Sequence, residues 1–218
     1  SGLMDNSFKD VKKVLWGILF INLMVAIAKI GVGTAIRSTS ITADGLHSLS
    51  DGISNIVGLV GVWLASKPED KCHPYGHRKF ETLAGLFISI MLFGIGVKVV
   101  IDGIGRIIQP VVPEITFESL VVLIITLVIN LFISIFEYLK GKKLDSQILV
   151  SDSMHTRSDI YISLGVLTTA LGIKLGLPSI IDPITSFVVA GLIFKGAYEV
   201  FKCNRDVLVD RAAVDAEK

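Results

Sequence analysis

Two pentapeptides of the sequence read alike, His47-Ser48-Leu49-Ser50-Asp51 and His155-Thr156-Arg157-Ser158-Asp159, and each lies inside a long apolar stretch. On an α-helix, side chains four residues apart lie on one face, about one turn from each other. Each pentapeptide, if helical, therefore points an imidazole and a carboxylate in the same direction. Two such helices facing each other would offer two nitrogens and two carboxylate oxygens, which suit a tetrahedral, zinc-like site.

The composition of the chain indicates a membrane protein. The mean hydropathy is +0.68, 51% of the 218 residues are hydrophobic and 19% are charged. A soluble domain of this length has too small an interior for so much apolar surface. We therefore expect an all-α membrane protein. A net charge of +1, without a basic patch interleaved with aromatic residues, argues against a nucleic-acid partner.

The apolar segments predict a bundle of six transmembrane helices in one transport domain, residues 14–202. Each segment is about 23 to 29 residues long, or about 35 to 43 Å as a helix, and the hydrocarbon core of a bilayer is about 30 Å thick. We expect a short N-terminal segment, 1–13, in which 1–3 read as an expression scar, and a short polar tail, 203–218. The six segments are 14–36, 39–66, 80–108, 116–139, 147–174 and 179–201.

Basic residues predict the orientation of this bundle. Fourteen of them lie on the side of the termini and three on the other side. Cytoplasmic loops carry the excess of Lys and Arg, so we expect both termini in the cytoplasm. Both His/Asp pairs then lie about 12 to 18 Å from one end of their helix, near the membrane midplane. The fourteen are Lys9, Lys12, Lys13, Lys67, Lys71, Arg78, Lys79, Lys140, Lys142, Lys143, Lys202, Arg205, Arg211 and Lys218, and the three are Arg37, Arg106 and Lys174.

Matched ionisable pairs at one depth favour an ion site over a purely structural role. A single polar residue in a membrane helix usually bonds to a neighbouring helix, which is our interpretation of Asn22, Asn130 and Ser134. A buried His/Asp pair is costly, and alternating-access transporters place their ions at the midplane. Imidazole binds metal only when it is neutral, so protons and metal would compete for such a site, which predicts exchange.

Three stretches together resemble one known family. They read Ala43-Asp44-Gly45-Leu46-His47-Ser48-Leu49-Ser50-Asp51, His73-Pro74-Tyr75-Gly76-His77-Arg78-Lys79-Phe80-Glu81 and Asp152-Ser153-Met154-His155-Thr156-Arg157-Ser158-Asp159. They look like the membrane domain of the cation diffusion facilitators, which are metal/proton antiporters. The similarity runs from the first helix to Arg211.

The resemblance implies a transport site, a substrate and a location. Zinc is the first expected substrate, with cadmium, cobalt or iron as others, and the second substrate is the proton. The protein would be a homodimer in a lipid bilayer, in the cell (inner) membrane, and a secondary transporter rather than an enzyme. The implied metal ligands are His47, Asp51, His155 and Asp159.

The connection between the second and third segments holds a second candidate cluster. Pro74 and Gly76 disfavour a helix there, so ligands could converge through a turn. Cys72 is either an additional soft ligand or an ordinary thiol, and whether the loop binds metal stays open. The ligands that the resemblance implies are Asp70, His73 and His77.

Four further residues have two interpretations each. Asp44 and Asp152 each precede a ligand His by three residues, so they either orient the ligands or relay protons, or they line a solvated cavity. Lys79 and Asp210 match positions that form charge pairs between protomers in similar proteins, or they are solvated ends.

Other classes of protein fit less well. The sequence has no His-Glu-x-x-His string, which argues against a metalloprotease, and its two cysteines cannot make a disulfide framework. A passive metal channel and a metal-binding, transport-inactive subunit remain alternatives. Most family members continue into a cytosolic domain, so we expect either a truncated chain or a short form.

Overall fold

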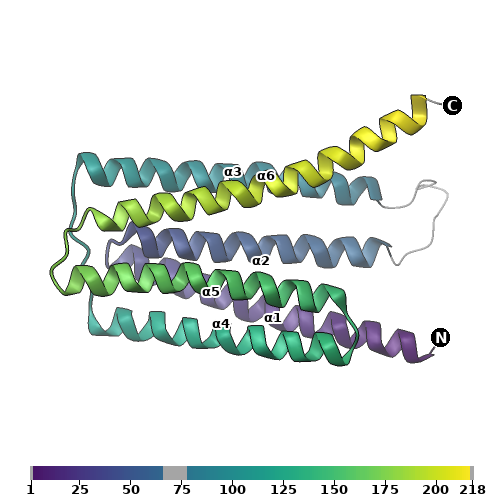
Figure 1. Cartoon of the computed structure of the whole chain (residues 1–218), viewed down its shortest axis with the longest axis horizontal. Helices are drawn as coiled ribbons and strands as arrows, with labels where there is room; N and C mark the ends of the chain where they lie inside the picture. Colours follow the sequence, from purple (N-terminus) through teal and green to yellow (C-terminus); the bar gives the residue numbers. More distant parts are fainter. Residues whose placement is uncertain (1, 66–77, 217–218) are drawn as a thin grey trace.

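The computed structural model describes residues 2–65 and 78–216, and these residues form six α-helices and no strand. The helices run antiparallel, and both chain termini lie at the same end of the bundle, together with the connection between α4 and α5 (Figure 1). We call this end the terminal end. The helices are α1 (Gly2–Ala35), α2 (Thr39–Ala65), α3 (Arg78–Ile108), α4 (Phe117–Lys143), α5 (Gln147–Lys174) and α6 (Ile181–Ala216).

The helix bounds follow the apolar segments to within two residues, with three exceptions. The first helix begins at Gly2 rather than at residue 14, α4 ends at Lys143 rather than at 139, and the last helix continues to Ala216 rather than ending near 201. The described residues of the predicted N-terminal segment and tail are therefore helical. Hydropathy indicates where a helix can meet lipid, whereas polar residues with good helix propensity extend a helix beyond that point.

Four helices are long and apolar enough to cross a membrane, within the part of the chain that the structure describes. They contain the candidate spans Lys9–Ala35, Leu86–Ile108, Phe117–Lys143 and Ile181–Glu199. Helices α2 and α5 carry the His/Asp pentapeptides together with many Ser and Thr residues. The candidate ligands thus lie on two helices in which polar residues are mixed with apolar ones.

The helices pack as three extensive pairs, α1 with α2, α3 with α6 and α4 with α5. Helix α2 also contacts α3, α5 and α6, and it lies between the α3/α6 pair and the other helices (Figure 1). Glycines bring α3 close to α6, because a Cβ atom at Gly96 or Gly103 would lie 2.7 or 2.5 Å from the ring of Phe194 or Phe187.

The largest apolar core lies toward the end of the bundle away from the terminal end. It contains residues from the C-terminal parts of α3 and α5 and the N-terminal parts of α2, α4 and α6. This core closes the bundle on that side. Its buried members include Ile36, Ile41, Val99, Leu120, Leu123, Val166, Ala170, Val189 and Ile193.

A buried carboxylate of α6 caps the N-terminus of α2. Asp182 Oδ1 accepts hydrogen bonds from the hydroxyls of Ser38 (2.7 Å) and Ser40 (2.5 Å). Its Oδ2 accepts from the backbone N–H (2.8 Å) and the hydroxyl (2.7 Å) of Thr39. An acidic group at a helix N-terminus satisfies free N–H groups and complements the helix dipole. Asp182 therefore fixes the α1–α2 turn, where Arg37 has a left-handed φ of 60°.

We expect Asp182→Ala to destabilise the protein strongly. The substitution leaves the hydroxyls and N–H groups of this turn buried without their acceptor, and each such group costs about 1 to 3 kcal/mol. A loss of about 3 kcal/mol corresponds to a fall in melting temperature of roughly 6 to 12 °C for a chain of this size. Thermal unfolding in detergent, with Glu118→Ala at the exposed start of α4 as the control, measures it. Equal melting temperatures for the two variants would contradict the capping role.

Candidate metal centre

Helices α2 and α5 bring the two pentapeptides face to face. His47 Nε2 lies 3.0 Å from Asp159 Oδ1, and His155 Nε2 lies 3.0 Å from Asp51 Oδ1. Within each helix, His47 Nε2 is 3.6 Å from Asp51 Oδ2, and His155 Nε2 is 3.9 Å from Asp159 Oδ2. Each imidazole therefore pairs with the carboxylate of the opposite helix, and all four polar groups converge.

The polar atoms of this cluster suit a cation. His47, Asp51 and Asp159 each offer a ligand atom, and these atoms lie within 4.8 Å of one another. Among the described residues, Asp51 Oδ2 is buried without a hydrogen-bond donor. His155 lies at the edge of the cluster, with a side chain that is 55% exposed, whereas His47 is buried. Imidazole nitrogen and carboxylate oxygen are ligands that a divalent transition metal accepts.

A buried lysine of α1 borders the cluster. Lys29 Nζ lies 3.3 Å from Asp44 Oδ2, and both side chains are at most 2% exposed. Lys29 also donates to the hydroxyl of Ser163 (3.0 Å), which in turn donates to Asp44 (3.0 Å). This ion pair joins α1, α2 and α5 beside the candidate ligands. Asp44 is therefore buried in an ion pair.

Comparison with known proteins identifies the family. A model of the cation efflux transmembrane domain matches residues 15–209. The chain is 36% identical over 208 residues to an uncharacterized transporter of Methanocaldococcus jannaschii, which covers 94% of this chain and 72% of that protein. This chain belongs to the cation efflux family. The predicted resemblance and the expectation of a multi-pass integral membrane protein are confirmed.

Two other relatives of this cation efflux protein are named for a metal. The manganese efflux system protein MneP of Bacillus subtilis is 30% identical over 213 residues, covering 94% of this chain and 71% of MneP. The probable zinc transporter MSC2 of Saccharomyces cerevisiae is 29% identical over 198 residues, covering 89% of this chain and 27% of MSC2. The family thus includes proteins named for different metals.

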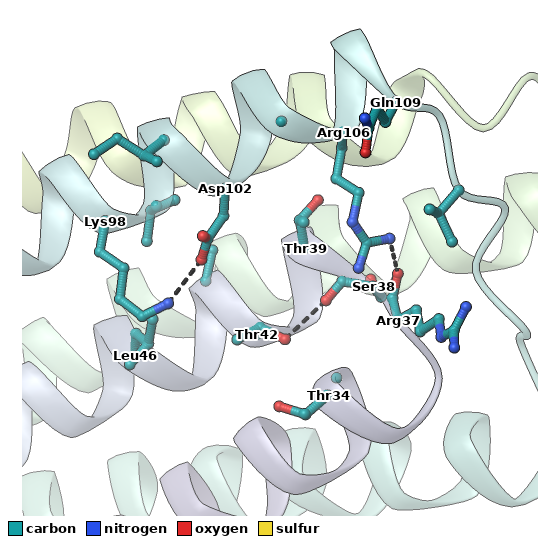
Figure 2. Close-up of a pocket in the computed structure, with 16 residues that line it drawn as sticks. Thr34, Arg37, Ser38, Thr39, Thr42, Leu46, Lys98, Asp102, Arg106 and Gln109 are labelled. Carbon is teal, nitrogen blue, oxygen red and sulfur yellow. Dashed lines mark hydrogen bonds and ion pairs between the residues drawn. The ribbon is translucent and has the colours of Figure 1, made fainter.

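The cation efflux protein also has a cavity of about 630 Å³ away from the terminal end, between the α1–α2 turn and α3 (Figure 2). Figure 2 shows Arg106 donating to the carbonyl oxygen of Arg37 (2.6 Å) and Lys98 paired with Asp102 (2.8 Å). Three cations and one carboxylate line this cavity, so its charge does not favour a metal cation. The candidate ligands do not line it.

Several predicted residues lie outside the part that the structure describes. This holds for the loop cluster, for Cys72 and for the side chains of Lys79 and Asp210. Asp152 is described and is half-buried, with its Oδ2 buried and without a donor among the described residues. Ser134 donates to the carbonyl oxygen of Ser153 (3.1 Å), which fits its predicted role between helices. The loop cluster comprises Asp70, His73 and His77.

Three buried ionisable residues of the cation efflux protein were not predicted from its sequence, Lys29 in α1, Glu137 in α4 and Asp182 in α6. Each is an isolated charge inside an apolar segment, and a membrane helix rarely carries one without a partner or a function. That rule applied to every segment would have found all three. It would not have found their partners, because these lie on other elements of the fold.

Proposed function

We propose that this cation efflux protein exports a divalent metal, with zinc as the first candidate, in exchange for protons. The ligands would be the two His/Asp pairs of α2 and α5, His47, Asp51, His155 and Asp159. The single observation that supports this most is the crossed pairing, in which each imidazole lies 3.0 Å from the carboxylate of the opposite helix. Metal-binding groups this close together repel one another or share protons unless a cation lies between them.

The charges of the site explain why metal and protons would compete. Two carboxylates balance the two charges of the metal, so the loaded site is close to neutral in a low-dielectric setting. Without metal, the same groups favour protons, and an imidazole that holds a proton on the metal-binding nitrogen cannot bind metal. A site that opens first to one side and then to the other therefore exchanges the two cations.

We infer that the metal enters from the terminal end. The apolar core closes the bundle at the opposite end, and His155 is the exposed ligand. We propose that all six helices span the cell membrane, with the terminal end in the cytoplasm, because the sequence predicts fourteen of the basic residues on that side and three on the other. Helix α2, whose described residues are buried or half-buried, would then be shielded from lipid by the neighbouring helices. By family resemblance we propose a homodimer.

Zinc is the first candidate because two of the four donors are imidazole nitrogens, whereas manganese prefers an oxygen-rich site. The relative MneP, a manganese efflux system protein, makes manganese the main rival, followed by cadmium, cobalt and iron. Calorimetric titration of the purified protein with zinc and with manganese ranks them. Tighter binding of manganese would overturn the assignment of zinc and leave the ligand assignment intact.

We expect a pH gradient to drive zinc into vesicles that contain the protein. With an interior one unit more acidic than the medium and the membrane potential clamped, each exchanged proton contributes about 1.4 kcal/mol, or about a tenfold accumulation of zinc. A zinc-sensitive dye inside the vesicles measures this. A passive channel would equalise zinc without accumulating it, and a transport-inactive subunit would give no flux. Either result would contradict the proposal.

We expect the loop cluster to matter less than the site between α2 and α5. His73→Ala combined with His77→Ala should lower the amount of metal bound per chain and leave part of the pH-driven flux, since the ligands at the midplane are intact. Metal analysis of the purified variant and the vesicle assay measure the two effects. A flux loss as large as that of Asp51→Ala would show that the loop is essential.

A further inference from the structure

Two carboxyl groups meet in the interior, between α4 and α5. The Glu137 side chain is completely buried, and no donor group of the described residues reaches either of its oxygens. The group that it contacts is the carboxyl of Asp152, whose Oδ2 is also buried without a donor. Two carboxyl groups form a hydrogen bond only when one of them carries a proton.

In the described part of the chain, the lysine side chains near Glu137 contact other groups. Lys140 Nζ lies over the ring of Phe136, 5.9 Å from its centroid. Lys140 and Lys143 line a separate cavity with Asp10 and Lys13 of α1, and Glu137 does not line it. On α5, the next titratable group toward the ligands is His155. Among the described side chains, Asp152 is thus the one titratable group in contact with Glu137.

Two adjacent carboxylates cannot both be ionised where the dielectric is low, because desolvation and mutual repulsion both favour the neutral form of one of them. The pair must therefore hold a proton or another cation. The pair offers two carboxyl groups and no imidazole. The neighbouring candidate metal site has two imidazole ligands as well as two carboxylates. A proton is the occupant that this donor set fits best.

The pair lies next to the candidate metal centre. Asp152 precedes His155 by three residues, which places both on one face of α5, about 4.5 Å apart along the helix axis. Because α5 starts at the terminal end, the pair lies on the terminal side of His155 (Figure 1). His155 is also the exposed ligand.

We propose that Glu137 and Asp152 form a proton-holding pair that relays protons along the interface of α4 and α5. This role rests on the proposed metal/proton exchange. When a proton arrives, an O–H bond forms on Asp152 while the O–H bond of Glu137 breaks and its proton passes on toward the terminal end. The charge of the pair is the same before and after.

Glu137→Gln tests the pair, with Glu118→Gln at the exposed start of α4 as the matched control. Infrared spectroscopy of the full chain in vesicles should show the carbonyl stretch of a protonated carboxyl group in the wild type and in the control. Glu137→Gln should lack it, because its amide can donate to an ionised Asp152. Asp152→Asn should lose the same band, which guards against misfolding of a single variant.

Transport separates a proton-carrying role from a structural one. Glu137→Gln should lower pH-driven zinc uptake at least about tenfold, as loss of a proton-transfer group does. Exchange of zinc inside for zinc outside, which moves no net proton, should stay within about twofold of the wild type. The proposal would be overturned if the wild type lacked the infrared band. It would also be overturned if Glu137→Gln kept normal pH-driven zinc uptake, or lost pH-driven uptake and zinc/zinc exchange equally.

The same measurements distinguish this proposal from the proposed function. A wild-type protein without pH-driven uptake would overturn proton exchange and, with it, the carrying role of the pair. The infrared band would still decide whether Glu137 and Asp152 hold a proton.

Discussion

Asp51→Ala and Asp159→Ala are each expected to abolish zinc binding between α2 and α5 together with pH-driven uptake. Each removes a charged ligand and leaves an imidazole of the opposite helix without the carboxylate that lies 3.0 Å away. Loss of a group that only supports a metal ligand already costs about 10- to 100-fold in affinity, so loss of a ligand should cost at least about 100-fold. Calorimetry and the vesicle assay measure the two losses.

The control for this prediction is Asp102→Ala. Asp102 is a half-exposed carboxylate of α3 that pairs with Lys98 in the cavity of Figure 2, away from the candidate ligands. This variant should bind and transport zinc as the wild type does. Wild-type affinity in both Asp51→Ala and Asp159→Ala would show that the ligands are assigned wrongly. If the variants bound zinc normally but did not transport it, the two carboxylates would act in proton exchange and not as zinc ligands.

Lys29→Met is expected to cost about 3 to 5 kcal/mol of stability, because removal of one partner leaves the other charge of a buried ion pair without compensation. Asp44 is that partner, and the remaining hydroxyl of Ser163 cannot balance its charge. The side chain of Met has a volume similar to that of Lys, so packing changes little. Thermal unfolding in detergent measures the loss.

The double variant Lys29→Met with Asp44→Asn separates charge from packing. Removal of both charges should restore most of the stability, since an uncharged pair carries no desolvation cost. Lys195→Met, at an exposed position of α6, is the control and should melt as the wild type does. A double variant less stable than Lys29→Met would show that Asp44 is held by contacts other than the ion pair.

Much of the fold was predictable from the sequence because hydropathy acts along the chain. The starts of α2 and α5 and the ends of α3 and α5 agree with the predicted segments to within a residue. The spacing of four residues in His47/Asp51 and His155/Asp159 places each pair on one helix face whatever surrounds it. Within the part of the chain that the structure describes, four helices are apolar enough to be candidate spans.

The sequence by itself determined the helices, the family and which side chains share a helix face, because local periodicity and composition set these properties. Only the tertiary structure decided which residues meet across helices: His47 with Asp159, Lys29 with Asp44, Asp182 with the start of α2 and Glu137 with Asp152. These partners are between 15 and 143 positions apart in the chain, and no local pattern relates them. Buried charges need partners, and packing of the bundle decides which ones they find.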